Sequence, residues 1–165
     1  MGSDGVVSLR RSISAMATAA VFAPMASIAD SVPTPDPFAQ YVDPQGVVLA
    51  VQTPPDSGDA PVRLVVYAGA DTFLETASAK YWADVNEDGA AIVNLGSMPA
   101  GDYAFVAYVD ENRDGKLNRG WLGAGKPKEP YAFSNGVRPK LRRPRFDEAK
   151  VDVSVGSVVV IEIED

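Results

Sequence analysis

The sequence predicts an all-β protein, a small antiparallel β-sandwich of about seven strands with one long ordered loop. Three observations lead to this prediction. Short runs rich in β-branched and aromatic residues recur every 8–12 residues or so, as in sandwiches. Clusters of Gly, Pro, Asn and Asp, the usual turn residues, separate these runs. Outside the first residues, no segment sustains the 3.6-residue period of an amphipathic helix.

The predicted strands are short and mostly β-branched, and they cover residues 47–51, 62–67, 80–85, 90–95, 103–109, 150–155 and 157–163. The segment Asn86-Glu87-Asp88-Gly89 predicts a hairpin between the third and fourth strands. Residues 70–79 are expected to form a short turn or one helical stretch, and residues 129–135 are expected to be irregular. Alternation along the strands predicts the inward-facing side chains, namely Leu64, Val66, Ile92, Leu95, Tyr103, Phe105, Val151, Val153, Val159 and Ile161.

Composition excludes several function classes. The chain has 165 residues, of which 46% are hydrophobic, enough for the core of one domain. The formal net charge of −7 argues against nucleic acid or an anionic membrane as a partner, because phosphate binding requires clustered Lys and Arg. The absence of Cys and His excludes disulfides, zinc–thiolate sites, thiol catalysis, a Ser-His-Asp triad and a His base. We therefore expect no enzyme, although a hydrolase that uses only carboxylates stays open.

The N-terminus has the pattern of an export signal. Arg10 and Arg11 precede an apolar run from Ile13 to Ala26, which is too short to span a bilayer. Small residues in Ser27-Ile28-Ala29 predict cleavage after Ala29. The alternative is a buried N-terminal helix, but Pro24 interrupts the run. The predicted organisation is a signal peptide at 1–29, a Pro-rich extended leader at 30–45 and a β-sandwich domain at 46–165, with the mature protein periplasmic or secreted. No later segment predicts a membrane span.

The segment after residues 103–109 has the spacing of a calcium loop. Oxygen-bearing side chains recur at Asp110, Asn112 and Asp114, Gly115 permits a sharp turn, and Lys116 offers a backbone carbonyl. The twelfth position, where an EF-hand has a bidentate Glu, is Trp121, so the EF-hand pattern is incomplete. A further ligand must come from elsewhere, and Glu129 is the nearest acid in sequence. The alternative is an acidic loop without an ion. The predicted affinity for Ca²⁺ is weak, roughly 10⁻⁴ to 10⁻³ M.

Aromatic and amide side chains suggest a second kind of site in the long loop. Trp121, Tyr131, Phe133 and Asn135 could line a face that stacks on sugar rings or on peptide prolines. The simpler interpretation, which we favour, is that the loop packs these aromatic rings against the edge of the sandwich. The partner would be a protein or glycan of the cell envelope, and its identity stays open.

Basic residues cluster near the C-terminus, at Arg138, Lys140, Arg142, Arg143, Arg145 and Lys150. Such a run could bind an anion, but it is more often a solvated face. Because the rest of the domain is acidic, pairing with its own carboxylates is a further possibility.

Several motifs of this chain resemble a bacterial family of secreted proteins known only as domain-of-unknown-function family 2141. The resemblance depends on the turn from Met98 to Tyr103, on the acidic loop with Gly115-Lys116-Leu117, on Leu122-Gly123, on Pro127 to Asn135 and on Phe146 to Ala149. It implies export and a β-sandwich of the prealbumin- or immunoglobulin-like kind, and it implies no established activity.

The chain departs from this family pattern in two places. Asn118 stands where an Asp is common, which removes a negative charge from the acidic loop. The segment from Leu141 to Arg145 is basic where the family is usually neutral. Together, these observations predict an exported, non-enzymatic binding or scaffold protein with a calcium-stabilised acidic loop, or alternatively a carbohydrate- or peptide-binding accessory module.

Overall fold

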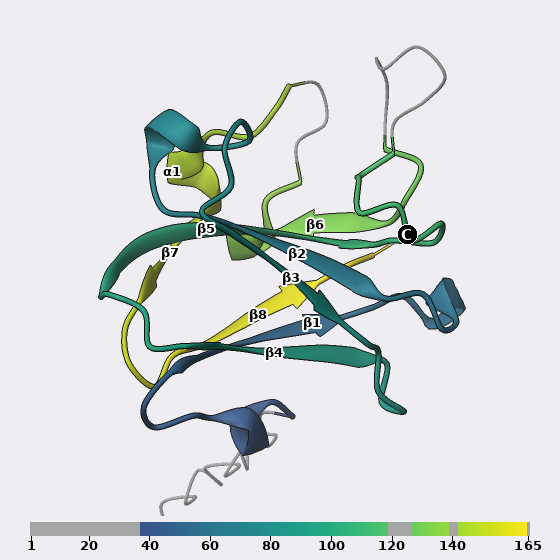
Figure 1. Cartoon of the computed structure of the whole chain (residues 1–165), viewed down its shortest axis with the longest axis horizontal. Coiled ribbons are helices and arrows are strands. Elements are labelled where there is room, and N and C mark those ends of the chain that lie inside the picture. The colour runs from purple at the N-terminus through teal and green to yellow at the C-terminus, as the bar shows by residue number, and fades with distance from the viewer. Residues whose placement is uncertain (1–36, 119–126, 139–141, 165) are drawn as a thin grey trace, which may run out of the picture. The chain divides into compact units, whose positions relative to one another are not determined.

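The computed structural model of the chain describes residues 37–118, 127–138 and 142–164, all of which belong to one compact unit, residues 35–165. The predicted signal peptide and cleavage site lie outside the described residues. Within the described residues, eight strands form two sheets, which confirms the predicted small all-β sandwich (Figure 1). In the described part of the chain, no helix is long and apolar enough to cross a membrane.

A three-stranded sheet forms one layer, in the order β4 (Ala90–Gly96), β1 (Val47–Gln52) and β8 (Val158–Glu162). β1 pairs antiparallel with β4 but parallel with β8, a departure from the expected all-antiparallel pairing. The strand before β8, β7 (Lys150–Val153), belongs to the other sheet, so the chain crosses between the sheets from β7 to β8. The turn at Gly156, whose φ is 85°, makes this crossing possible because glycine adopts a positive φ without steric cost.

A five-stranded sheet forms the other layer. β3 (Ala79–Ala83), β2 (Val62–Tyr67) and β5 (Gly101–Val109) lie side by side, and β6 (Tyr131–Phe133) and β7 (Lys150–Val153) share the far edge of β5. All of its pairs are antiparallel. Because β5 is nine residues long, its first half can pair with β7 and its second half with β6. A short helix, α1 (Phe146–Ala149), precedes β7.

The turn at residues 86–89 forms as predicted, but it does not join a hairpin. Asn86 N–H donates to Ala90 O at 2.9 Å, and one isolated bridge links Val85 to Ala91. Beyond that point β3 and β4 separate into different sheets. β3 pairs instead with β2, and β4 pairs with β1, so tertiary pairing overrides the local turn signal.

The main core fills the space between the two sheets and contains Leu49, Leu64, Phe105, Val153 and Ile161, all nearly or fully buried. Of the ten predicted inward-facing side chains, nine pack in or against this core. Ile92 does not. It packs instead on the outer face of the three-stranded sheet, because that face is also covered.

Two further layers cover the outer faces of the sheets. Phe38 and Tyr41, from the second half of the predicted leader, pack on Ala50 and Ile92, and residues 39–41 form a 3₁₀ turn there. On the five-stranded sheet, an outer cluster combines residues of the sheet with α1; its buried members are Val65, Tyr67, Ala104, Val106, Tyr108, Phe133, Phe146 and Ala149. A 3₁₀ turn at Ala70–Thr72 leads into Phe73, which packs edge-on against Tyr67 and Phe146. β1, β2 and β5 are therefore buried on both faces.

Candidate metal site

The acidic loop begins where β5 leaves the sheet. Backbone bonds fix its first residues, since Val109 N–H donates to Pro130 O at 3.0 Å and Asp110 N–H donates to Pro61 O at 2.9 Å. Asp110 is fully buried, which is rare for a carboxylate unless it is well partnered. The strand pairing therefore places the first predicted ligand in the interior, at the base of the loop.

The carboxylate of Asp110 organises the loop around itself. Its Oδ1 accepts a hydrogen bond from Asp114 N–H at 3.1 Å, and its Oδ2 accepts one from Gly115 N–H at 2.7 Å. The chain turns back on itself through Arg113 and Gly115, whose φ angles are 59° and 73°. Glycine makes the second of these angles inexpensive. The predicted sharp turn at Gly115 is therefore present, and Asp110 closes it.

The next two predicted side-chain ligands, Asn112 and Asp114, accept hydrogen bonds from backbone N–H groups of the same turn. Asn112 Oδ1 accepts from Asp114 N–H at 3.1 Å, and Asp114 Oδ1 accepts from Lys116 N–H at 2.8 Å. Asp114 Oδ2 accepts from the side-chain amides of Asn118 at 3.2 Å and Asn112 at 3.3 Å. These bonds, that from Asn118 foremost, lower the pKa of Asp114 below its ordinary value, so the group stays ionised at neutral pH.

Glu129 reaches the loop from the segment before β6. Its Oε2 accepts a hydrogen bond from Asn118 N–H at 2.9 Å, and Lys128 N–H donates to Asn118 O at 2.8 Å beside it. Glu129 is only 5% exposed, and its Oε1 is buried with no hydrogen-bond partner in the described part of the chain. Such an oxygen is costly to leave unpaired, so it marks a position where a cation fits.

Three of these acids lie near enough to Tyr108 to affect the pKa of its phenol. Tyr108 lies at the end of β5 and is 4% exposed. Burial is the main cause that raises its pKa to about 12, and the negative charge of Asp110 adds to this effect. Glu129 and Asp114 raise the pKa by smaller amounts, whereas the positive charge of Arg63 lowers it. Three carboxylates therefore act on the same phenol.

The donor set consists of oxygen atoms of several kinds. It combines carboxylates, side-chain amides and the peptide oxygen of Lys116, and such a mixture suits Ca²⁺. In the described residues, no group of three or more His, Cys, Asp or Glu side chains converges on one point. A site here would therefore depend on amide and carbonyl oxygens as well as carboxylates. Trp121, at the twelfth position of the loop, lies outside the described residues.

The residues of the second predicted site mostly have structural roles. The sequence-based prediction that 129–135 is irregular was wrong, because Tyr131–Phe133 forms β6. Phe133 is buried in the outer cluster, edge-on to Phe73 at 6.3 Å between ring centroids, so its ring offers no face to a ligand. Asn135 donates its side-chain N–H to Glu148 O at 2.9 Å. Tyr131 is half-buried, and a binding face in this loop would depend on Tyr131 and Trp121 alone.

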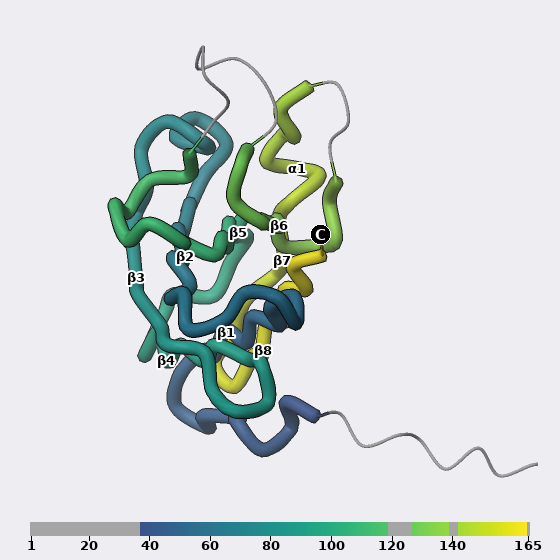
Figure 2. Tube along the Cα trace, turned by 90° about the vertical axis from the view of Figure 1, so that its right-hand side faces the viewer, coloured from purple at the N-terminus to yellow at the C-terminus, as the bar shows by residue number. Residues whose placement is uncertain are grey.

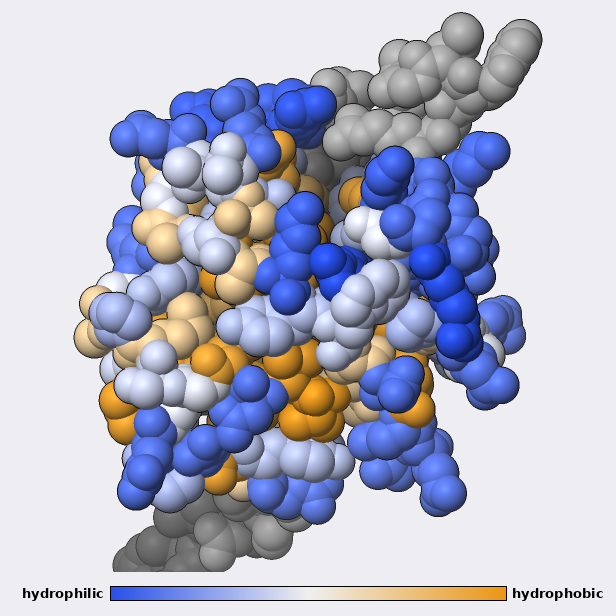
Figure 3. All heavy atoms as spheres, in the orientation of Figure 1, coloured by the Kyte–Doolittle hydropathy of each residue, from blue (hydrophilic) through white to orange (hydrophobic). Residues whose placement is uncertain are grey.

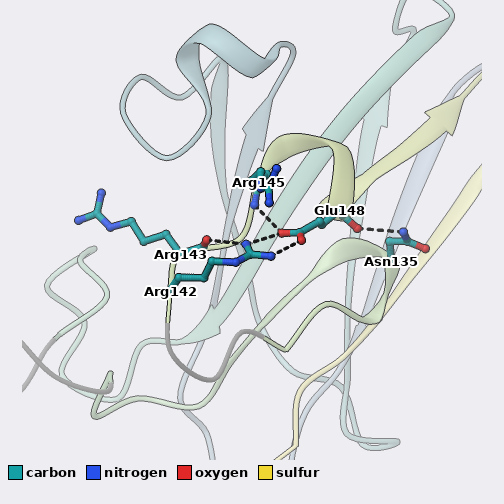
Figure 4. Close-up of polar contacts among 5 residues, drawn as sticks. All are labelled: Asn135, Arg142, Arg143, Arg145 and Glu148. Carbon is teal, nitrogen blue, oxygen red and sulfur yellow. Dashed lines mark hydrogen bonds and ion pairs between the residues drawn. The ribbon is translucent and has the colours of Figure 1, made fainter.

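The basic run near the C-terminus is largely paired with acids. Arg142 forms a two-pronged ion pair with Glu148, and Arg145 N–H donates to the same carboxylate at 2.8 Å (Figure 4). Arg138 pairs with Glu164, and Lys150 with Asp102 at 2.8 Å. Lys140 lies outside the described residues. Internal charge pairing thus explains most of the described part of this run.

Sequence reasoning missed one exposed aromatic residue, Trp82 of β3. It is 46% exposed, and the guanidinium of Arg63 lies over its ring at 4.5 Å from the centroid. A methyl group added at Gly115 would lie 3.5 Å from Trp82 Cζ2, so the acidic loop packs against this ring. The sequence could have predicted this exposure. In a strand, Lys80 and Trp82 lie on the face opposite to Ala79, Tyr81 and Ala83, so the tryptophan shares a face with a charged residue.

The fold and the loop together define a small two-sheet β-sandwich protein with an acidic turn at one end of its larger sheet, in which Asp110 is buried and the following residues are mostly exposed. The chain belongs to the bacterial family described as "Uncharacterized protein conserved in bacteria (DUF2141)", whose model matches residues 54–161. This confirms the resemblance seen in the sequence. Neither a curated protein nor a solved structure matches the chain.

Proposed function

We propose that this is an exported, non-enzymatic β-sandwich protein that binds or scaffolds other molecules of the cell envelope, with its acidic loop held by a calcium ion. The ligands are Asp110, Asn112, Asp114, the peptide oxygen of Lys116 and Glu129. One observation supports the calcium site, namely the buried Oε1 of Glu129 beside the loop, which has no hydrogen-bond partner among the described residues. A cation would satisfy that oxygen and offset the negative charge of Asp110 and Asp114.

Glu129 takes the part that the twelfth residue plays in an EF-hand. In that loop a bidentate Glu completes the coordination sphere from the end of the same segment. Here the twelfth residue is Trp121, and Glu129 comes instead from the chain that returns to β6. The ion would thereby tie the end of β5 to the start of β6. Because few carboxylates are available to the ion, we expect an affinity in the weak range, roughly 10⁻⁴ to 10⁻³ M.

The absence of enzymatic activity is supported by side-chain chemistry. The sequence contains no His and no Cys, so the commonest general base and the commonest thiol nucleophile are missing. The exposed carboxylates near the C-terminus, such as Glu148 and Glu164, are paired with arginines. A protein of this kind acts by binding, and its outer surfaces are the places where a partner would dock.

Thermal unfolding with calcium tests the site. At 10 mM Ca²⁺, about 100 times a Kd of 10⁻⁴ M, the folded state gains about 2.7 kcal/mol, so the unfolding midpoint should rise by several degrees over that in chelator. Mg²⁺ at the same concentration should give a much smaller shift, because it dehydrates reluctantly.

Two variants make the assignment specific. Glu129→Gln should abolish most of the calcium shift, whereas Glu87→Gln, at an exposed acid in the turn before β4, should leave it intact. If the wild-type midpoint is the same in 10 mM Ca²⁺ and in chelator, the calcium site is wrong.

Export is tested separately by cell fractionation and N-terminal sequencing. We expect mature protein in the periplasm or medium beginning at Asp30, and intact Met1 in the cytoplasm would contradict export.

A further inference from the structure

β3 is an exposed edge of the five-stranded sheet. One of its sides pairs with β2 from Val62 to Val66, and no described segment pairs with the other side. In Figure 2, β3 runs along the border of the described chain, with nothing described beyond it. Such an edge presents unpaired backbone N–H and C=O groups, which are a template for another strand.

The side chains of β3 are incompletely covered on both faces. Lys80 and Trp82 are exposed on the outer face, and Ala79, Tyr81 and Ala83 are only half-buried although they pack against the main core. Figure 3 views the molecule from the side on which β3 lies, and hydrophobic residues reach the surface there between polar ones. A further strand along β3 would cover these side chains.

The usual protection of an edge strand is weak here. β3 contains no Pro, pairs with β2 without a bulge, and carries one charged residue, Lys80. β4, at an edge of the other sheet, is different. Its first residue exchanges bonds with Asn86, and its last amide, Gly96 N–H, donates to Asn94 Oδ1 at 2.8 Å. The chain thus occupies the ends of β4 and leaves β3 open.

The sequence of β3 is complementary to itself. If two copies pair antiparallel with Tyr81 at the centre, Ala79 faces Ala83 and Lys80 faces Trp82 across each half of the ladder. An ammonium group beside an indole ring is a favourable cation–π contact. Because Gly115 packs against Trp82, Lys80 of the second copy would also approach the acidic loop, whose carboxylates carry the opposite charge.

We propose that β3 is a homodimerisation edge, through which two copies of this chain form one continuous sheet by antiparallel pairing about Tyr81. The interface involves five residues a side together with the neighbouring Arg63 and Gly115, so it lies below the size of a stable interface. The dimer is therefore weak and forms at tens to hundreds of micromolar protein, on the order of the affinity of a small, transient contact. It does not depend on the calcium site.

Sedimentation velocity over a range from micromolar to millimolar protein, with chelator present, tests the dimer. The wild-type protein should move from monomer to dimer as its concentration rises. Trp82→Lys sets two ammonium groups against each other in both cross-strand pairs and should weaken the dimer at least tenfold. The double variant Lys80→Glu with Trp82→Lys replaces each repulsive pair with an opposite-charge pair and should restore the dimer.

The design separates association from folding. Both variants carry the Trp82→Lys change, so a folding defect would affect both, and restoration in the double variant assigns the loss to the strand pairing. Val155→Lys, which changes another exposed hydrophobic residue away from β3, should leave the dimer unchanged. A wild-type protein that stays monomeric at millimolar concentration overturns the proposal. So does a dimer that Trp82→Lys leaves intact, because a different surface then joins the copies.

Discussion

Two glutamates beside the same sheet, Glu129 and Glu148, have opposite surroundings. Glu148 lies in α1, and its two oxygens accept bonds from Arg142 and from the backbone of Arg145. Glu129 lies before β6, and its only described partner is the N–H of Asn118. Among the described residues, Arg142 supplies a cation to Glu148, and no cationic side chain pairs with Glu129.

Burial makes this difference consequential. The Glu148 side chain is about one-third exposed, at 36%, so water can solvate its charge if Arg142 is removed. Glu129 is 5% exposed, so water cannot easily replace a missing partner. The comparison teaches that Glu148, the better paired of the two glutamates, depends less on its partner for the stability of its charge than Glu129 does. We therefore expect an external cation to have its larger effect at Glu129.

The largest expected effect concerns the base of the acidic loop. Asp110→Ala removes a buried carboxylate that accepts bonds from Asp114 N–H and Gly115 N–H. Each of the two donors that loses its partner costs about 1–3 kcal/mol, so the free energy of unfolding should fall by roughly 2–6 kcal/mol. Urea unfolding in chelator measures this. Asp147→Ala, at a mostly exposed carboxylate of α1, is the control and should change stability by less than about 0.5 kcal/mol. A cost below about 1 kcal/mol at Asp110 would contradict the account of the loop.

Removing the charge should have opposite effects at the two glutamates. In chelator, Glu129→Gln should stabilise the protein by about 1 kcal/mol, because it replaces a buried and incompletely partnered carboxylate by a neutral amide. Glu148→Gln should lower the unfolding midpoint, because the ion pair with Arg142 is lost. The two variants differ from the wild type by the same chemical change, so each is the control for the other. Equal signs in a thermal unfolding experiment would show that Glu129 is already satisfied without an ion.

The pH dependence of stability sharpens the contrast at Glu148. The hydrogen bonds from Arg142, foremost, and from Arg145 lower the pKa of Glu148 from 4.5 to about 2. Because the folded-state pKa is depressed, the contribution of this group is fully present above pH 4.5 and is lost as the pH falls toward about 2. The difference in unfolding midpoint between wild type and Glu148→Gln should therefore shrink across that window. A difference that stays constant from pH 6 to pH 2 would mean that the ion pair contributes nothing.

Much of the sandwich could be predicted because its strands are locally encoded. The β-branched runs at 47–51 and 62–67 and the run at 103–109 became β1, β2 and β5, within two residues at each end. The pairing of strands could not be predicted in the same way. Whether 80–85 pairs with 90–95 or with β2 depends on contacts distant in sequence, and the turn at 86–89 is compatible with both. The same holds for Ile92, which faces outward because Phe38 covers that side.

The curled acidic loop was predicted from spacing, whereas the contact of Glu129 with it depends on topology. The positions of Asp110, Asn112 and Asp114 suffice to predict a loop that curls around one point, and their backbone bonds show that curl. The role of Glu129 depends on the return of the chain to β5, which spacing does not encode. α1 was missed because a helix of four residues is too short to show a period.

The smallest expected effect is an optical one, and it separates the two glutamates without perturbing either. Trp82 packs against Gly115 of the acidic loop, whereas the described partners of the Glu148 carboxylate are Arg142 and Arg145. In a Trp121→Phe variant, where Trp82 is the remaining indole, Ca²⁺ should produce a small, saturable change in fluorescence as the loop tightens around the ion. The titration should be performed at low micromolar protein concentration, at which the proposed dimer does not form. Glu148→Gln in this background should leave the midpoint of the titration unchanged, and Glu129→Gln should remove the response. A response that survives Glu129→Gln would assign calcium binding to other residues and leave the unpartnered oxygen of Glu129 without a role.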